Sequence, residues 1–414
     1  MQKRVVVTGL GILSPIGSNL KDFCENLRNG ISGIRKITHF DASTYPSQIA
    51  GEIKDLDPLN HLSPRFINKT DRFTQLGVIA TKLALQDSHL ELQKIDLNRI
   101  GVVIGTSIGG LSVAEEQHTI FLEKGYKRIN PFMQTSVFPS SCSSHIALYF
   151  NFHGSAETIS TACASSNSAV GHAMGRIFSG DCDIVVTGGS DAAITPFILG
   201  SFCSLRLVSR KNEEPEKACK PFSKDRDGFA LSEGCGILIL EELEHALRRD
   251  AFIYGELLGY GATCDAHHIT SSAPDAVYAS MAMEKALKNA NIDRTEIDYI
   301  NCHGSATPSN DPIETLAIKK TFREKAYEIP ISATKSMVGH TMGACGSIEL
   351  VACFIMLQHG FIHPTINYNT PDPDCDLFYV PNHAIEKQLN RIMSISLGYG
   401  GQNSVIVLQR FKSL

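Results

Sequence analysis

The sequence predicts an α/β protein built in layers, in which apolar strands alternate with helices. Its 414 residues are 43% hydrophobic, which is enough for a large buried core. Short runs rich in β-branched residues recur along the whole chain, and longer segments with helical character separate them. Such alternation is typical of layered α/β folds. The length exceeds that of an average single domain, so two domains or two fused halves are expected.

Seven apolar runs are predicted to form strands. In chain order they cover residues 4–10, 99–107, 183–190, 235–243, 254–261, 297–304 and 404–410. They are short and β-branched, as strands usually are. The clearest helices are longer segments between them, over residues 73–88, 276–292 and 311–322.

The two halves of the chain show the same order of sequence features. Each begins with strands, carries a long helix and places reactive side chains at glycine-rich turns. We therefore expect a division near residue 250, into an N-terminal half over residues 1–250 and a C-terminal half over residues 251–414. No proline- or serine-rich linker marks this boundary, so the prediction depends on the pattern of strands and helices alone.

Composition argues against several classes of protein. Net charge is 38 − 43 = −5, which is too close to neutral to favour nucleic acid as a partner. The longest apolar stretches, such as residues 235–240, are far shorter than a membrane-spanning helix, and no apolar signal region precedes the first strand. The twelve cysteines are scattered, with no spacing typical of zinc. We expect a cytoplasmic protein without disulfides, bound metal or membrane association.

The most informative stretch covers residues 159–174 and contains Cys163. Small and hydroxyl-bearing residues lead there into an alanine- and serine-rich segment, so the thiol is predicted at the junction of a strand and a helix. Unpaired backbone N–H groups and the helix dipole at such a junction lower the pKa of a thiol. Two histidines next to glycine, His303 and His340, follow far downstream. This combination is typical of acyl transfer through a covalent thioester.

Simpler interpretations exist for these motifs. A cysteine in this position could be a small apolar residue at the start of a core helix. Residues 5–17 carry Gly9 and Gly11 after a strand, as a dinucleotide-binding turn would, but Ser14 stands at the third glycine position. Residues 105–111 lack the lysine of a phosphate-binding loop. Both glycine segments are therefore predicted to be tight turns.

Five segments together resemble one enzyme family. They are TACASS at 161–166, PFSKDRDGFALSEG at 221–234, HGSATPSND at 303–311, KSMVGHTMGACGSIE at 335–349 and LGYGGQN at 397–403. In this order and spacing they resemble β-ketoacyl–acyl carrier protein synthases of the elongating type II class. The resemblance implies a thiolase-type α/β fold, with two similar βαβαβαββ halves in a five-layered α-β-α-β-α arrangement. It also implies substrates carried on the phosphopantetheine of an acyl carrier protein, no other cofactor, and a dimer.

The resemblance assigns the chemical roles as expectations. Cys163 would accept the acyl chain as a thioester. His303 and His340 would donate hydrogen bonds to the enolate that forms when a malonyl thioester loses CO₂. Lys335 would orient these groups and supply positive charge, with Glu349 as its partner.

The resemblance also implies a binding site around the thiol. The oxyanion hole would consist of the backbone N–H groups of Cys163 and Tyr399, with glycines beside Tyr399 allowing the close approach. Thr270, Ser305 and Thr307 match positions that bind the pantetheine arm.

Departures from the fatty acid pattern predict the cargo. Leu397 and Tyr399 replace two phenylalanines of the family, and the acyl pocket is expected to be bounded by Ile108, Met133 and Gln134. Gln134 would reach across the dimer interface. Several motifs resemble the ketosynthase α subunit of type II polyketide synthases, which predicts polyene or poly-β-keto chains and either a homodimer or a heterodimer with a chain-length-factor homologue. Housekeeping fatty acid elongation is the alternative.

Local clusters of basic residues are expected to dock the acidic carrier protein. They comprise Arg65, Lys69, Arg72, Lys124, Lys127, Arg128 and Arg206. The alternative for each is an ordinary solvated surface charge.

Other classes fit the sequence less well. A thiolase needs a second catalytic cysteine near the C-terminus, and residues 376–414 contain none. A chain-initiating synthase of the type III class would have asparagine in place of His340. A non-catalytic chain-length factor should lack the nucleophile, which is present as Cys163. A papain-like protease would need neither the second histidine nor the lysine. The sequence therefore favours a condensing enzyme.

Overall fold

The computed structural model describes residues 3–54 and 56–412. In these residues twelve strands join into one mixed sheet, whose main path runs in the order β10-β9-β13-β14-β8-β1-β7-β6-β4-β5. The strands of the first half are β1 (Val5–Leu13), β4 (Ile100–Gly105), β5 (Ala156–Ile159), β6 (Ile184–Ala192) and β7 (Leu231–Glu242). Those of the second half are β8 (Gly255–Cys264), β9 (Tyr299–Asn301), β10 (Ile331–Ser332), β13 (Arg391–Gly398) and β14 (Gln402–Gln409). The short strands β2 (Arg35–Lys36) and β3 (Ile49–Gly51) join the edge of β7, and β11 (Phe361–Ile362) pairs with β12 (Ile385–Glu386).

The two halves of the sheet repeat one pattern. From the middle outwards, β1-β7-β6-β4-β5 matches β8-β14-β13-β9-β10, and the first two pairings in each set are antiparallel. The outer two pairings in each set are parallel. The halves join where Val5–Val7 of β1 pairs with Gly255–Leu257 of β8. Each strand of the first half therefore has a counterpart in the second half, and the turns that follow two such strands occupy equivalent places in the fold.

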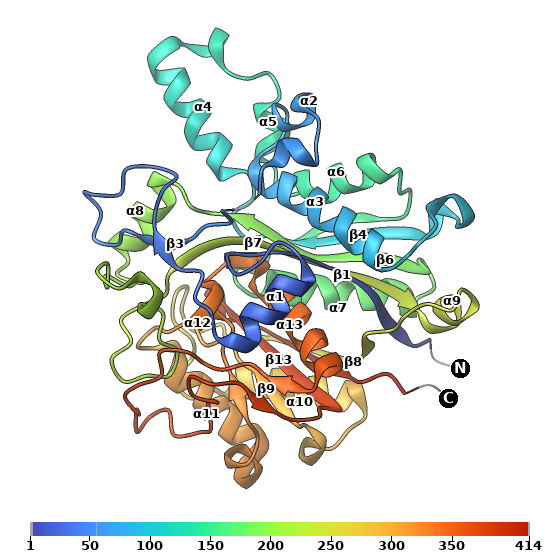
Figure 1. Ribbon diagram of the computed structural model, residues 1–414, viewed down its shortest axis with the longest axis vertical. Helices are drawn as coiled ribbons and strands as arrows, with labels where there is room; N and C mark the ends of the chain where they lie inside the picture. Colours follow the sequence, from blue (N-terminus) through green and yellow to red (C-terminus); the bar gives the residue numbers. More distant parts are fainter. Residues whose placement is uncertain (1–2, 55, 413–414) are drawn as a thin grey trace.

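Helices lie on the outer face of each half of the sheet and also between the two halves (Figure 1). Helices α3 (Arg72–Asp87) and α6 (Ser141–Phe150) pack on the first half, and α10 (Val277–Ala290) and α11 (Asn310–Phe322) lie outside the second. Between the halves, α7 (Ser165–Phe178) and α13 (Cys345–His359) contact each other and strands of both. The layers are therefore outer helices, the first half of the sheet, the central helices, the second half of the sheet and outer helices. These five layers confirm the expected thiolase-type arrangement. The remaining helices are α1 (Leu20–Asn29), α2 (Pro64–Ile67), α4 (Leu111–Lys124), α5 (Met133–Val137), α8 (Pro196–Ser204), α9 (Leu243–Arg248) and α12 (Lys335–Val338).

Helix α13 shows how position in the layers explains composition. Over Met342–His359 the mean hydropathy is 1.3, so by length and composition alone this is the one segment of the described chain that could cross a membrane. In the fold 89% of that segment is buried. Because α13 has protein on every side, it carries no polar face, unlike a helix at the surface.

The predicted elements agree with the structure except at the active-site turns. The three predicted helices correspond to α3, α10 and α11. The predicted strand over residues 297–304 ends early, at Asn301, because Gly304 has a positive φ of 44° and the chain turns there. Three strands of the main path were missed, β5, β10 and β13, and so were the short strands β2, β3, β11 and β12. β5 is only four residues long, and β13 reads RIMSISLG, in which serines interrupt the apolar run.

Candidate active site

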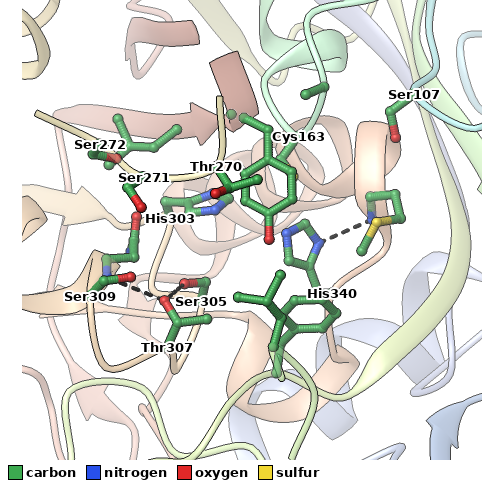
Figure 2. Close-up of a pocket in the computed structure, with 18 of the residues that line it drawn as sticks. Ser107, Cys163, Thr270, Ser271, Ser272, His303, Ser305, Thr307, Ser309 and His340 are labelled. Carbon is green, nitrogen blue, oxygen red and sulfur yellow. Dashed lines mark hydrogen bonds between the residues drawn. The ribbon is translucent and has the colours of Figure 1, made fainter. Parts of the chain in front are cut away.

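A cavity of about 320 Å³ opens beside Cys163, where turns from both halves meet. It is lined by Ser107 after β4, by Cys163 before α7, by His303 after β9 and by the turn between β13 and β14. Figure 2 shows side chains from these separate segments pointing toward one another. Since equivalent strand ends of the repeated halves converge here, the internal duplication itself places the cavity.

Cys163 stands on a tight turn at the start of α7. The residue before it, Ala162, has a positive φ of 51°, which is unusual for a residue with a Cβ. The Thr161 N–H donates to Ser165 Oγ at 2.9 Å, and this bond closes the turn. The thiol side chain is only 8% exposed. The predicted junction of strand and helix is thus present, with the thiol turned into the cavity.

The expectation of a lowered thiol pKa is wrong for this cavity. Burial raises the pKa of the Cys163 thiol to about 11, although Lys335 and the backbone N–H groups of Tyr399 and Cys163 act in the opposite direction. The physical reason is that a thiolate loses its hydration in a closed site, and this loss outweighs the local positive groups. The resting thiol is therefore neutral near pH 7.

Two turns hold the histidines next to each other in the cavity. The Glu314 carboxylate accepts from the backbone N–H groups of His303 and Gly304, at 2.6 and 2.8 Å. The His340 N–H donates to the carbonyl of Ala230 at 2.8 Å. The two imidazole rings lie 5.5 Å apart between centroids, almost perpendicular to each other. Burial, together with the Lys335 charge, lowers the pKa of both imidazoles well below the usual value, so both rings are neutral.

Hydrogen bonds fix the same tautomer in both rings. The Met342 N–H donates to His340 Nδ1 at 3.1 Å, and Lys335 Nζ lies 3.3 Å from His303 Nδ1. An ammonium has no lone pair, so it can only donate. Each Nδ1 must therefore be an acceptor, which places the proton of each neutral ring on Nε2. Both histidines are consequently hydrogen-bond donors at Nε2.

Lys335 and Glu349 form an ion pair inside the protein, with side chains 0% and 1% exposed. Lys335 Nζ also donates to the carbonyl oxygen of His303 at 2.8 Å. Burial alone would lower the pKa of Lys335, but the neighbouring Cys345 and Glu349 outweigh it and raise that pKa above the usual value. Burial raises the pKa of Glu349 to about 7 against the effect of Lys335. Lys335 thus keeps its charge beside His303.

The glycine-rich turn after β13 packs directly against the nucleophile. A Cβ added at Gly398 would lie 2.6 Å from the Thr161 carbonyl oxygen and 3.2 Å from the Cys163 nitrogen. Gly400 and Gly401 have φ values of 76° and 73°. This close approach brings the Tyr399 N–H to the Cys163 sulfur, next to the N–H of Cys163 itself. Two backbone N–H groups therefore lie beside the Cys163 sulfur.

One end of the cavity is lined by hydroxyl groups. The predicted residues Thr270, Ser305 and Thr307 all line it, and the Ser305 and Thr307 hydroxyls are 2.9 Å apart (Figure 2). Sequence reasoning missed three further serines of this wall: Ser271, Ser272 and Ser309. The first two directly follow Thr270, so their adjacency to a predicted binding residue was the available signal.

The other end is apolar. Of the residues predicted for the acyl pocket, Ile108, Leu397 and Tyr399 line the cavity. Four apolar residues of this end were not predicted: Phe202, Leu207, Phe229 and Met342. They come from loops and short helices, where no periodicity marks a pocket residue. The Phe229 ring meets the His340 ring edge to face, with centroids 5.0 Å apart.

The sequence matches two family models, the N-terminal domain of β-ketoacyl synthases over residues 2–246 and the C-terminal domain over residues 254–369. The chain belongs to the β-ketoacyl synthase family. It is a ketosynthase, a condensing enzyme of the acyltransferase type.

Relatives of this ketosynthase come from two branches. It is 43% identical over 411 residues to a 3-oxoacyl-[acyl-carrier-protein] synthase 2 of Synechocystis, and 41% identical over 409 residues to that of Coxiella burnetii, in each case over 99% of both chains. Among solved structures it resembles a type II polyketide ketosynthase in complex with its acyl carrier protein and bound to the hexaketide, with a TM-score of 0.91 and 38% identity over 100% of both chains. It also resembles the ishigamide ketosynthase/chain length factor, with a TM-score of 0.93 and 34% identity over 100% of both chains.

Two predicted pocket residues of the ketosynthase lie away from the cavity in the single chain. Met133 and Gln134 belong to α5, and neither lines the cavity. Gln134 is exposed. A role for them in the acyl pocket therefore requires a partner subunit.

The basic residues predicted to dock a carrier protein differ in how exposed they are and in whether they already contact another side chain. Arg65, Lys124, Lys127, Arg128 and Arg206 are exposed. Lys69 is half-buried, with its ammonium 4.1 Å from the centre of the Phe132 ring. Arg72 instead forms two bonds of 2.6 and 2.7 Å with the buried carboxylate of Glu233. Because Arg72 is already paired inside the protein, we leave it out of the docking surface proposed below.

Proposed function

We propose that this ketosynthase catalyses a decarboxylative Claisen condensation, in which an acyl chain held on Cys163 is joined to a malonyl unit on an acyl carrier protein. One observation carries the proposal: the thiol shares a buried cavity with two neutral imidazoles that both have a proton on Nε2. Such an arrangement suits stabilisation of an oxyanion rather than protonation of a carbon.

In the first half-reaction, Cys163 sulfur attacks the thioester of the incoming acyl carrier. The carbonyl oxygen becomes an oxyanion, for which the N–H groups of Cys163 and Tyr399 are the nearest backbone donors. The C–S bond to pantetheine then breaks. Because one thiol replaces another, the proton of Cys163 ends on the released pantetheine thiol, and the step needs no external base. The neutral resting thiol is compatible with this exchange.

In the second half-reaction, the malonyl thioester loses CO₂, and the electron pair of the broken C–C bond forms an enolate. Its oxygen would accept from Nε2 of His303 and His340. The enolate carbon attacks the acyl carbonyl, a new C–C bond forms, and the C–S bond to Cys163 breaks. The Cys163 thiolate that leaves takes up a proton from water, which restores the neutral resting thiol. Lys335 would contribute indirectly, because its bond to His303 Nδ1 keeps the donor proton on Nε2.

The proposal includes a binding site for the pantetheine arm and a docking surface for the carrier protein. The hydroxyls of Thr270, Ser305 and Thr307 would hold the amide groups of the pantetheine arm. The docking surface for the acidic carrier protein would consist of Arg65, Lys69, Lys124, Lys127, Arg128 and Arg206. The second subunit of the dimer would be another copy of this chain or a chain-length-factor homologue. The all-thiol state of the twelve cysteines fits a reducing, cytoplasmic location.

For the cargo we propose a polyketide chain. Support comes from the polar Tyr399 in the cavity and from the similarity to two solved structures, a type II polyketide ketosynthase with its acyl carrier protein and a ketosynthase/chain length factor. Fatty acid elongation is the second candidate. It is favoured by the 41–43% identity to curated 3-oxoacyl synthases.

Intact-mass analysis tests the chemistry directly. The ketosynthase is incubated with an acyl carrier, and Cys163 should gain the mass of the acyl group, which addition of malonyl carrier should then remove as a 3-oxoacyl product. Cys163→Ser is the matched control and should give neither signal, because a serine hydroxyl stays protonated near neutral pH. Product formation by the serine variant at a rate near wild type would disprove the assignment.

A further inference from the structure

Tyr399 lies beside the nucleophile, in the glycine-rich turn that packs against Cys163. It starts the turn Tyr399–Gly401 between β13 and β14, and both it and Leu397 line the cavity. Its backbone N–H lies at the Cys163 sulfur. Its side chain is therefore anchored next to the point where an acyl chain would be attached.

The hydroxyl of Tyr399 has no protein partner. Burial and the nearby Cys163 raise the pKa of this phenol, and no hydrogen bond to another residue of the described chain accompanies them. A half-buried phenol that gives up water without another partner loses free energy, so such groups are normally paired. The hydroxyl is open to the cavity rather than sealed in the protein, so a chain that fills the cavity displaces its water and binds better when it supplies an acceptor in return.

The position of Tyr399 limits which atoms of that molecule it can meet. The same cavity is lined by hydroxyls such as Thr270 and Ser305, which are proposed to hold the pantetheine arm, and by apolar groups such as Ile108 and Phe229. A chain attached to Cys163 passes Tyr399 within its first few carbons. A saturated chain presents only CH₂ groups there. An oxygen on carbon 3 is the first acceptor beyond the thioester.

The malonyl carboxylate is a weaker candidate for this partner. A donor bonded to that carboxylate would stabilise the ground state, in which the charge is still on the carboxylate. Catalysis requires interactions that strengthen as the charge moves to the enolate oxygen. A hydrogen bond from Tyr399 to the carboxylate would therefore oppose decarboxylation.

We propose that Tyr399 is a specificity-determining residue whose hydroxyl donates a hydrogen bond to an oxygen on carbon 3 of the acyl chain bound to Cys163. This inference rests on the proposed function and sharpens it. The favoured cargo is a 3-oxo or 3-hydroxy chain rather than a saturated chain or a polyene without oxygen. A 3-oxo chain is the direct product of a condensation, so the reaction that supplies this substrate would be an earlier condensation with no reduction in between.

The test compares acylation of Cys163 by 3-oxohexanoyl and hexanoyl carrier protein, followed by rapid quenching and intact-mass analysis. The ratio of the two values of kcat/KM is determined for wild type, for Tyr399→Phe and for Tyr327→Phe. Tyr327 is 50% exposed and lies outside the cavity, which makes it a matched control. One hydrogen bond is expected to make the wild-type ratio about 3- to 10-fold in favour of the 3-oxo chain.

The expected result is that Tyr399→Phe brings the ratio close to one, while Tyr327→Phe keeps the wild-type ratio. A wild-type ratio near one would overturn the inference without reference to any variant. An unchanged ratio in Tyr399→Phe would also overturn it. If neither chain acylates Cys163, the proposed function fails as well, whereas equal acylation by both chains removes only the role of Tyr399.

Discussion

Replacing His340 by alanine should separate the two half-reactions. The imidazole is buried, neutral and held by the Met342 N–H, so its Nε2 proton can only be donated into the cavity. Removing it takes away one donor to the enolate oxygen. In the proposed mechanism the thioester oxyanion on Cys163 would instead accept from backbone N–H groups, which the substitution leaves unchanged. Decarboxylation should therefore fall steeply while acylation of Cys163 persists.

The size of the effect follows from the environment of the ring. Loss of one preorganised oxyanion donor typically costs about 10²–10³ in rate, which is about 3–4 kcal/mol. His340 is 3% exposed and packs against Phe229, so water cannot easily replace the lost donor. We expect the upper end of that range, about 10³. His340→Gln should recover part of the rate, because its amide nitrogen can reach roughly the position of Nε2.

The assay measures both steps on the same preparations. Release of labelled CO₂ from malonyl carrier protein reports decarboxylation, and intact mass after a timed mixing with acyl carrier reports acylation. The expected pattern for His340→Ala is a decarboxylation rate lower by about 10³ with acylation reduced far less. Equal loss in both steps, with no recovery in His340→Gln, would refute the donor role and would mean that the histidine positions or activates the thiol.

The remaining predictions use the same assays. Lys335→Met should impair both steps modestly, and His303 should lose its fixed tautomer, visible as a changed imidazole nitrogen signal in NMR; an unchanged signal would contradict the link. Because burial lowers the pKa of both imidazoles, they stay neutral as the pH falls through about 6.5, so decarboxylation by the enzyme should lose activity only below that value; a loss with a midpoint at or above 6.5 would contradict this. Charge reversal at Lys69 or Arg128 should raise KM for carrier-bound substrates and weaken its dependence on salt; unchanged KM in both variants at low and high salt would exclude them from the docking surface. Gln134→Leu should shift preference toward saturated chains if a partner subunit brings this residue to the pocket, and competition between saturated and unsaturated acyl carriers would show no shift if it does not.

The thiol and the two histidines that share the cavity could be found from the sequence because their turns are encoded locally. Cys163 stands before a stretch of small residues, and His303 and His340 each adjoin a glycine whose φ is positive in the structure, 44° at Gly304 and 73° at Gly339. Such turns depend on neighbouring residues rather than on the rest of the fold. The alternation of strands and helices was also readable, since burial on both faces makes each central strand a continuous apolar run.

The apolar wall of the cavity could not be predicted in the same way. Phe202, Leu207 and Phe229 lie in different parts of the chain, and nothing in their local sequence distinguishes a cavity residue from a core residue. The exposure of Gln134 in the single chain could not be predicted for a related reason. A polar residue in an apolar context predicts a functional contact, but its exposure depends on which surface α5 occupies.

The sequence by itself determined the order of the layers, the identity of the thiol and of the two histidines, and the pairing of Lys335 with Glu349, because these follow from short motifs at a consistent spacing. Only the tertiary structure decided their ionisation and their partners. Burial reverses the expected shift in the pKa of Cys163, the Met342 N–H fixes the proton of His340 on Nε2, and Glu233 engages Arg72 inside the protein. Desolvation and long-range hydrogen bonding depend on what the fold brings around a group, and a local motif carries no information about its surroundings in space.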